Sequence, residues 1–181
     1  MDLSANLKKE FGNGVYSFER ALTVEQSVDV LEMLEGLEYS ASTRYNKPVF
    51  SYNFDKCLTP THQLVDYINS DKFYNFIRFH TGITVTKTLS CWASAYTQGH
   101  FLTPHSDAVN DRRITYLFYF HRGWKPEYGG NIAFDRQTHW QMFVPQLGTL
   151  VLFDVKDNAN RHMVTQVVQD RTRYAITGWL T

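Results

Sequence analysis

The chain has 181 residues, of which 43% are apolar and 15% aromatic, and its 18 basic and 18 acidic residues cancel in net charge. These values are typical of a globular protein with a sizeable core, and they exclude a disordered chain and a strongly basic nucleic-acid binder. Only two cysteines occur, so a disulfide framework is not expected.

The first residues, MDLSANLKKEFGNG, carry no apolar run, which predicts that there is no signal peptide. No stretch approaches the roughly 20 apolar residues that a membrane span needs. We therefore expect a cytoplasmic protein that has neither a membrane nor a nucleic acid as its partner.

The first part of the chain predicts a strand and then a helix. Residues 15–20 are a short strand candidate. Thr23 and Gln26 have the spacing of a capping box, and apolar residues then recur at helical spacing to about Tyr39.

A second helical segment is predicted to open at Thr61, to continue past Ile77 and to stop at Gly82. Residues 39–60, between the two helical segments, are polar and aromatic without a clear period. They indicate a long loop or an irregular hairpin.

The character of the sequence changes after Gly82, where segments rich in β-branched and aromatic residues alternate with turn-forming stretches. These strand candidates cover residues 84–97, 113–120, 131–136, 139–144, 149–154, 163–168 and 173–180. No helices interrupt them, so we expect a mainly β protein with a sandwich or jelly-roll core braced by N-terminal helices. A single domain over residues 1–181 is expected.

The motif HSD places His105 and Asp107 two residues apart, at the entrance to the strand candidate 113–120. On extended backbone the two side chains face the same way and can converge on one ion. His162 stands at the mouth of another predicted strand, and such mouths can lie side by side in a jelly roll. Two histidines and one carboxylate form the facial triad of non-haem Fe(II) oxygenases. The alternative for HSD alone is a surface histidine beside a turn aspartate.

Arg173 opens the last strand candidate, eleven residues after His162. The stretch QDRT before it predicts a tight turn that would place Arg173 beside the His162 strand. A buried arginine needs an anionic partner, and its planar guanidinium suits the far carboxylate of a dicarboxylate that chelates a metal. Tyr119 offers a phenol to the same carboxylate. The alternative is a pair between Arg173 and a structural carboxylate such as Asp170, with Tyr119 as a core residue.

Together, HSD, the later His162 and an arginine opening RYAITGW resemble the double-stranded β-helix of the Fe(II)/2-oxoglutarate-dependent dioxygenases. The run RRITYLFYFHRGWKPEYGGNIAF is similar to the prolyl-4-hydroxylase-like branch, to the hypoxia-factor prolyl hydroxylases and still more to the ribosomal-protein prolyl hydroxylases. The resemblance covers about residues 85 to 181. The hypoxia-factor enzymes place the arginine two residues closer to the second histidine, so the ribosomal type matches better.

The resemblance implies Fe(II), 2-oxoglutarate and O2 as cofactors and co-substrates, with ascorbate as a candidate reductant. It also implies one role for each matching residue. Iron would be bound by His105, Asp107 and His162, and the distal carboxylate of 2-oxoglutarate by Arg173 and Tyr119. Tyr96 would lie near the end of 2-oxoglutarate that chelates the metal, and Ile132 would form an apolar wall of the pocket. Thr177 and Trp179, which share a strand face with Arg173, would line the floor of the site.

The implied reaction is hydroxylation of a prolyl residue in a protein, with succinate and CO2 as co-products. Ribosomal and translation proteins are candidate partners. Candidate substrate contacts are Arg112 and Arg113, which follow the iron ligands, and Tyr45 and Tyr52 in the 39–60 loop. That loop resembles the mobile loop that folds over peptide substrate in this branch. The alternatives are solvated charges at a strand end and an aromatic loop packed on the barrel.

Two other function classes remain. One is a dioxygenase of the same fold that acts on a free amino acid or another small molecule. The other is a non-enzymatic β-helix domain that binds metal or partner proteins, against which the intact ligand set argues.

Overall fold

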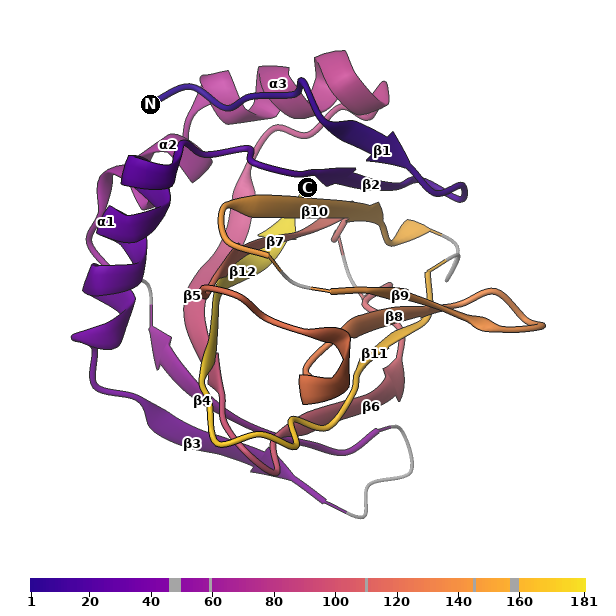
Figure 1. Ribbon diagram of the computed structural model, residues 1–181. Coiled ribbons are helices and arrows are strands. Elements are labelled where there is room, and N and C mark those ends of the chain that lie inside the picture. Colours follow the sequence, from indigo (N-terminus) through magenta and orange to yellow (C-terminus); the bar gives the residue numbers. More distant parts are fainter. Residues whose placement is uncertain (46–49, 59, 110, 145, 157–159) are drawn as a thin grey trace.

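The computed structural model describes residues 1–45, 50–58, 60–109, 111–144, 146–156 and 160–181 (Figure 1). Within this part of the chain, one antiparallel sheet runs in the order β1-β2-β10-β7-β12-β5-β4-β6-β11-β8-β9, and β3 pairs with β4. The strands are β1 (Lys8–Glu10), β2 (Val15–Phe18), β3 (Ser40–Arg44), β4 (Tyr52–Leu58), β5 (Thr88–Tyr96), β6 (Phe101–His105), β7 (Ile114–Phe120), β8 (Ile132–Asp135), β9 (Trp140–Phe143), β10 (Thr149–Asp154), β11 (His162–Val164) and β12 (Arg173–Leu180). The helices are α1 (Val24–Glu35), α2 (Gln63–Ile68), α3 (Asp71–Thr81) and the 3-10 helix η1 (Pro126–Tyr128).

The sheet curls on itself, so that β8, β9 and β11 face β10, β7 and β12 across an interior (Figure 1). Side chains from both sides meet there, for example Phe134 of β8 and Phe153 of β10, whose ring centroids are 5.0 Å apart. The predicted jelly-roll core braced by N-terminal helices is confirmed.

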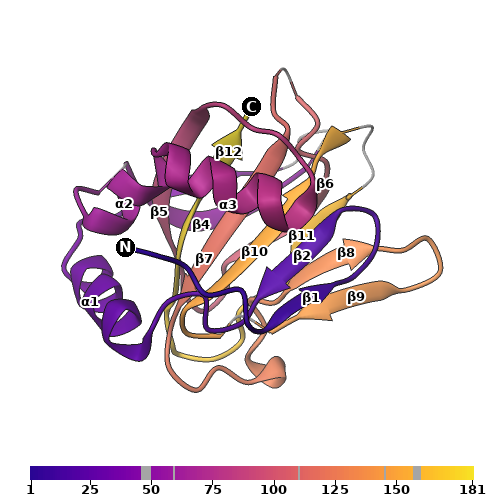
Figure 2. The same cartoon turned by 90° about the horizontal axis from the view of Figure 1, so that it is seen from above.

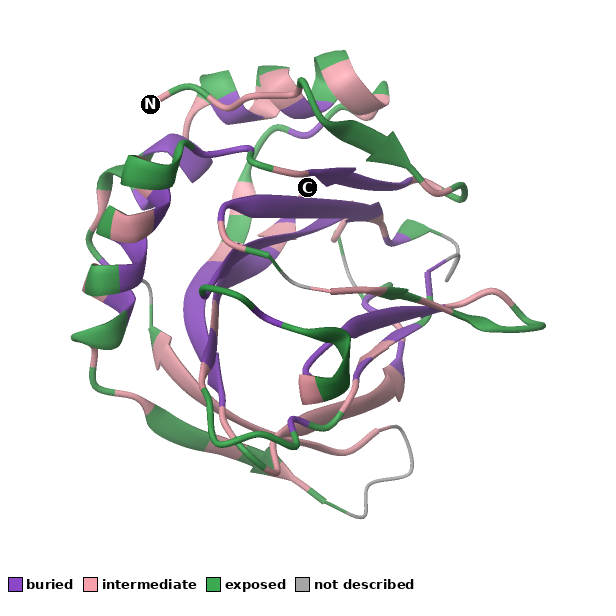
Figure 3. Cartoon of the chain, in the orientation of Figure 1, coloured by how far each residue is buried: buried purple, intermediate pink, exposed green. Residues whose placement is uncertain are grey.

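Strand β7 shows how alternation divides the core into two layers. Tyr116 and Phe118 point outward into the cluster that the helices cover, whereas Leu117 and Tyr119 point into the curled sheet. Figure 3 shows β2, β7 and β10 buried along their length and β1 exposed. Because β7 is covered on both faces, its sequence reads as a continuous run of large side chains.

Helix α1 begins as predicted. The Thr23 side chain accepts a hydrogen bond from the Gln26 N–H, and the Gln26 side chain accepts one from the Thr23 N–H. The prediction that the helix runs to about Tyr39 is wrong, because it ends at Glu35 and the Gly36 N–H caps the last turn. Tyr39 instead donates its hydroxyl to the Leu34 carbonyl.

The second helical segment is two helices that lie across the outer face of the sheet (Figure 2). Helix α2 is capped by His62 rather than opened by Thr61: the His62 Nδ1 accepts from the Leu64 N–H. Helix α3 ends as predicted at Gly82, whose φ of 74° places it in the left-handed region that favours glycine. No helix in the described ranges is long and apolar enough to cross a membrane.

Residues 39–60 form a hairpin of β3 and β4, apart from 46–49 and 59, which lie outside the described residues. Strand β4 pairs with β3 along one edge, and along the other edge with β6 at its start and β5 toward its end, and so joins the two halves of the sheet. Most of its side chains are half-buried on both faces, which accounts for the missing polar–apolar period.

Three strand predictions need correction. His105 ends its own strand, β6, rather than standing at the entrance to β7. Strand β11 ends at Val164, because the following residues bond to the irregular segment 128–131. Strand β12 does not lie beside β11: it pairs with β5 and β7, whereas β11 pairs with β6 and β8. The two strands meet only across the interior.

Candidate active site

His105, Asp107 and His162 lie together inside the curled sheet. His105 ends β6 and His162 begins β11, and the two are direct cross-strand partners. One ligand atom from each of the three side chains lies within 4.8 Å of the other two, and all three residues are buried. This is the arrangement that a facial metal site requires.

The two imidazoles are oriented by their own backbone. The His105 Nδ1–H donates to the Thr103 carbonyl at 3.1 Å, and the His162 Nδ1–H donates to the Asn160 carbonyl at 3.0 Å. These bonds leave each Nε2 with its lone pair directed at the cluster, which is the form that binds metals. Each acceptor is two residues before its histidine.

Asp107 is held by two donors on other strands. Its Oδ2 accepts from the Thr115 hydroxyl at 2.8 Å and from the Trp179 Nε1–H at 3.0 Å. Its Oδ1 lies 3.5 Å from the His105 Nε2. Its Oδ2 lies 3.8 Å from the His162 Nε2, so each carboxylate oxygen faces one of the two histidines.

The protonation states suit a cation. Burial lowers the pKa of His162 to about 4, and the charge of His105 acts in the same direction, so His162 is neutral near pH 7. Burial by itself raises the pKa of Asp107, but its contacts with His105, His162 and Trp179 outweigh burial and hold it below the usual range. Asp107 and His162 therefore offer an anionic oxygen and a neutral imidazole to a cation.

Arg173 is the largest fully buried side chain in the described ranges, and only 1% of it is exposed. Its Nη1 donates to the Gly130 carbonyl at 3.1 Å, but its Nε–H has no partner, and no carboxylate among the described residues pairs with it. The guanidinium lies 4.2 Å from the Tyr96 ring and 5.2 Å from the Tyr119 ring, whose hydroxyl also lacks a partner. A buried cation without an anion indicates that a ligand completes the site.

One cavity connects the metal cluster to Arg173. The predicted residues Tyr96, Ile132, Thr177 and Trp179 all line it, as do the three cluster residues. Tyr119 does not line this cavity and joins it only through Arg173. Arg171, the other arginine near the start of β12, is exposed and lies 5.4 Å from the Tyr128 ring.

The four candidate substrate residues divide into two kinds. The Arg112 guanidinium lies 3.4 Å from the centre of the Trp179 ring and 3.9 Å from the Asp107 Oδ1, at the edge of the cluster. Arg113 forms a partly buried ion pair with Asp154 at 2.9 Å. On the β3–β4 hairpin, Tyr45 is exposed and Tyr52 is half-buried beside the Phe54 ring at 5.5 Å.

A family model for the 2OG-Fe(II) oxygenase superfamily matches residues 91–181. The chain belongs to this superfamily. The matched residues contain the metal cluster and Arg173, whereas α1, α2, α3 and the β3–β4 hairpin lie before them.

This oxygenase is similar to the prolyl 3,4-dihydroxylase OGFOD1 of Ostreococcus tauri, with 27% identity over 147 residues that cover 70% of the chain and 29% of that protein. The chain thus spans less than a third of the length of this curated relative.

Among solved structures, a Trichoplax adhaerens prolyl hydroxylase in complex with a hypoxia-inducible factor peptide gives a TM-score of 0.75 at 21% identity, covering 93% of this chain and 83% of that one. A Pseudomonas putida prolyl-4-hydroxylase gives 0.71 at 18% identity, covering 93% and 92%. These likenesses show the fold.

The superfamily uses Fe(II), 2-oxoglutarate and dioxygen, and the residues present fit these groups. Two Nε2 atoms and a carboxylate oxygen converge where an Fe(II) ion needs them. The unpartnered Nε belongs to the buried Arg173, which lines the same cavity and suits a second carboxylate.

Several residues of the site were not foreseen from the sequence. Thr115 carries no signal beyond being one residue of a strand, yet it holds Asp107. Phe54 stacks on Tyr96 with ring centroids 5.1 Å apart, and Phe50 stacks on His105 at 4.8 Å. The aromatic content of residues 39–60 was the only feature of the sequence that pointed to such contacts, and it could not identify which rings face the site.

Proposed function

We propose that this oxygenase hydroxylates a prolyl residue in a protein substrate, with conversion of 2-oxoglutarate to succinate and CO2. The observation that carries the proposal is the single cavity that joins the His105, Asp107 and His162 cluster to an unpaired, buried Arg173. The names of its relatives support the prolyl class, since they are a prolyl 3,4-dihydroxylase and prolyl hydroxylases.

In this proposal the three cluster residues bind the iron. The carbonyls of Thr103 and Asn160 keep both histidines in the tautomer that leaves Nε2 unprotonated. When bound, iron with 2-oxoglutarate and dioxygen supplies the oxidising chemistry that inserts oxygen into a C–H bond.

Arg173 is proposed to bind the distal carboxylate of 2-oxoglutarate through its guanidinium, with the Tyr119 hydroxyl as a further donor. The Tyr96 ring stacks on this guanidinium and borders the path to the cluster. Ile132 and Thr177 line the same path, and the fixed lengths of Arg173 and 2-oxoglutarate set the distance between anchor and metal.

The substrate is proposed to approach past the β3–β4 hairpin. Phe50 stacks on the His105 ring, so this hairpin covers part of the metal cluster. Tyr45 and Tyr52 are carried by the same hairpin, and Arg112 lies beside Trp179, 3.9 Å from the Asp107 Oδ1. A hairpin that covers the cluster and carries aromatic side chains suits a polypeptide substrate better than a free amino acid.

A ribosomal or translation protein is the proposed partner, and a cytoplasmic location would suit it. Residues 1–181 are proposed to act as one oxygenase domain, because β2 pairs with β10 and the helices cover β7. The competing function is a dioxygenase of the same fold that acts on a free amino acid such as proline.

The deciding experiment is mass spectrometry of host-cell protein after incubation with the enzyme, Fe(II) and 2-oxoglutarate. A gain of one oxygen on a proline is expected, and fragment spectra with authentic hydroxyproline standards would assign the 3- or 4-position. If free proline were turned over and no protein were modified, the proposal of a protein substrate would be wrong, and the small-molecule alternative would hold.

The hairpin supplies a separate test. Tyr52→Ala should weaken peptide hydroxylation while slow, uncoupled conversion of 2-oxoglutarate continues. Deleting residues 44–54 is not a suitable version of this test, because Phe54 and the start of β4 pack and pair within the sheet. Equal peptide turnover by the Tyr52→Ala variant and the wild type would remove the hairpin from substrate binding.

A further inference from the structure

Three cations lie on aromatic rings beside the metal cluster. In each pair the positive group is near the face of the ring, where the π-electrons attract it. The pairs, with the distance from the positive group to the ring centre, are Arg44 over Phe50 at 5.1 Å, Lys56 over Trp92 at 4.4 Å and Arg112 over Trp179 at 3.4 Å.

The rings connect these cations to the cluster itself. Phe50 stacks on the His105 ring, with centroids 4.8 Å apart. Trp179 donates its Nε1–H to Asp107, and its ring centroid is 4.7 Å from that of Trp92. Both tryptophans line the metal cavity. The cations are therefore held next to the place where a substrate has to reach the metal.

Two of the pairs form a row across the sheet. Strands β4, β5, β12 and β7 are successive neighbours, and β4 carries Lys56, β5 carries Trp92 and β12 carries Trp179. Arg112 stands two residues before β7. Lys56 and Arg112 are thus at opposite ends of the row, with two tryptophan rings between them.

The hairpin turns its positive side chains toward the site. Lys56 is two residues after Phe54 on β4, so the two side chains share a face, and Phe54 lines the metal cavity. Arg44 is the cross-strand partner of Tyr52, which is two residues before Phe54 and also shares this face. The inner face of the hairpin is therefore basic as well as aromatic.

The charge of these cations is not balanced by the protein. Arg44 and Lys56 form no ion pair with a described residue, and Arg112 has only Asp107, a proposed metal ligand, at 3.9 Å. Burial lowers the pKa of Lys56 and of Arg112, because both are partly removed from water. Acidic and basic residues are equal in number over the whole chain, so this positive excess is local.

We propose that the site selects a prolyl segment with acidic side chains on both sides of the target proline, an inference that rests on the function proposed above. One carboxylate would pair with Lys56 and the other with Arg112, while the proline passes the tryptophan rings toward the metal. Opposite charges favour such a segment, and like charges reject a basic one. Among ribosomal and translation proteins, an acidic segment is favoured over the basic segments that contact RNA.

A single-stranded nucleic acid is the other polyanion to consider. Its bases stack on free aromatic faces, and its phosphates pair with cations. Each of the three rings already has a cation over it, and Phe50 also has the His105 ring, so a base would have to displace one of these groups. The contacts therefore favour an acidic polypeptide.

The test is binding of three acetylated peptides to the full chain with Fe(II) and 2-oxoglutarate in the absence of oxygen. Each peptide has one central proline, flanked on both sides by glutamate, by glutamine or by lysine. The glutamate peptide should bind about tenfold more tightly than the glutamine peptide, and the lysine peptide should bind most weakly. Equal binding of all three, binding of none or displacement of the glutamate peptide by a lower concentration of oligothymidylate would overturn the inference.

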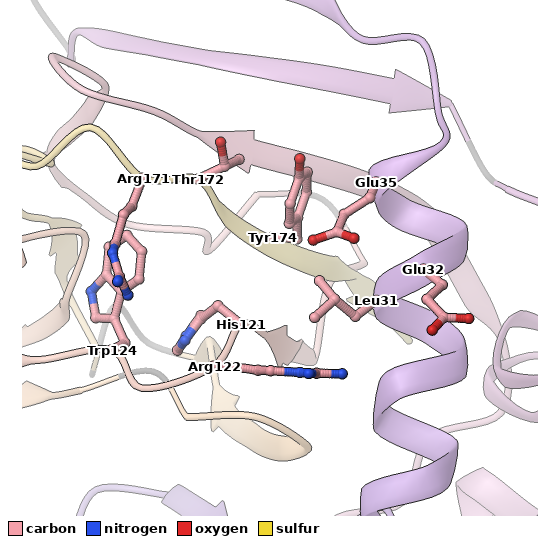
Figure 4. Close-up of a pocket in the computed structure, with 9 residues that line it drawn as sticks. All are labelled: Leu31, Glu32, Glu35, His121, Arg122, Trp124, Arg171, Thr172 and Tyr174. Atoms are coloured by element: carbon pink, nitrogen blue, oxygen red, sulfur yellow. The ribbon is translucent and has the colours of Figure 1, made fainter.

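Variants locate the recognition. Lys56→Gln and Arg112→Gln should each reduce the preference for glutamate over glutamine, and Lys56→Glu should shift it toward the lysine peptide. Two controls should keep the wild-type preference: Lys125→Gln, at a lysine over the Tyr128 ring outside the metal cavity, and Arg122→Gln, at an arginine of the separate cavity between α1 and β12 (Figure 4). An unchanged preference in both Lys56 variants and in Arg112→Gln would contradict the assignment.

Hydroxylation separates this inference from the proposed function. If all three peptides bound alike and each gained an oxygen on proline in air, prolyl hydroxylation would stand and the acidic selection would be wrong. If the glutamate peptide bound most tightly and no peptide gained oxygen, the charge selection would stand and the proposed reaction would be wrong.

Discussion

The two ends of the metal cavity are built differently. At the cluster, the Nδ1 atoms of His105 and His162 donate to carbonyls and Asp107 accepts two hydrogen bonds. At the other end, the Arg173 Nε has no partner in the described part of the chain, and the hydroxyl of Tyr119, which contacts Arg173 but does not line the cavity, has none either. The proposed metal ligands are therefore held in place by the protein itself, whereas the proposed carboxylate anchor still has an unsatisfied donor.

This difference has a physical reason. Metal ligands must be held in a fixed geometry before the ion arrives, since a facial site has strict angular requirements. A guanidinium recognises a carboxylate in its own plane and needs only to be kept dry and immobile. The predictions below test each end separately.

Removing a metal ligand should have the largest effect. His162→Ala is expected to abolish Fe(II) binding and turnover, because two ligands remain and the carbonyl of Asn160 loses its donor. Fe(II) titration and succinate release measure the two losses. His139→Ala, at an exposed histidine, is the control. Full activity of the His162→Ala variant would remove this residue from the ligand set.

Removing the anchor should leave the metal end intact. Arg173→Ala is expected to raise the KM for 2-oxoglutarate by at least about tenfold, since a buried charge pair is worth on the order of 2–5 kcal/mol. Fe(II) affinity should not change. Arg78→Ala, at an arginine on α3 that bonds to Asn75, is the control. A large effect from Arg171→Ala instead would show that the anchor had been misassigned.

Acid should weaken the fold through His121, which lies outside the metal cavity. Burial, helped by the charge of Arg173, lowers the pKa of His121 to about 3. The unfolded chain then binds more protons than the folded chain below about pH 6.5, so stability falls as the pH drops from there toward 3. From pH 7 to 4.5 this loss is about 2.6 kcal/mol. Urea unfolding should show a smaller acid loss in the His121→Phe variant, and an identical loss would contradict the prediction.

Loosening one bond at the metal end should have the smallest effect. Trp179→Phe keeps an aromatic surface under Arg112 but removes the Nε1–H that donates to Asp107. We expect Fe(II) affinity to fall by roughly tenfold, as for other partners of metal ligands, and the KM for 2-oxoglutarate to change little. Trp140→Phe, at an exposed tryptophan on β9, is the control. A loss confined to 2-oxoglutarate binding would mean that Trp179 acts at the other end.

The parts of the fold that sequence reasoning predicted are those set by local pattern. Short-range chemistry is enough to predict the capping box at Thr23, the left-handed C-cap at Gly82 and the strand β7 with its run of large side chains. The pairing of strands was not predictable in the same way. The stretch QDRT predicted a turn before Arg173, but it could not predict which strands pair with β12, because that depends on how the whole sheet curls.

The candidate site could be gathered from the sequence because its residues stand at strand ends or on one face of a strand. His105, Asp107 and His162 do converge, although the strand that carries His105 was not foreseen. Thr115 and Phe50 could not have been identified as site residues from the sequence. Their contacts with Asp107 and His105 depend on how the sheet folds, which the sequence pattern does not reveal.

The cross-strand pairing of His105 with His162 also ties iron to folding. The two residues are far apart in sequence, so an ion bound by both holds β6 and β11 together only in the folded state. A ligand that binds only that state adds about 2.7 kcal/mol of stability at a hundredfold excess over its Kd. Iron-depleted enzyme should consequently unfold more often and be degraded sooner by cellular proteases. The iron supply of a cell would then set how much of this oxygenase survives, as well as how fast it works.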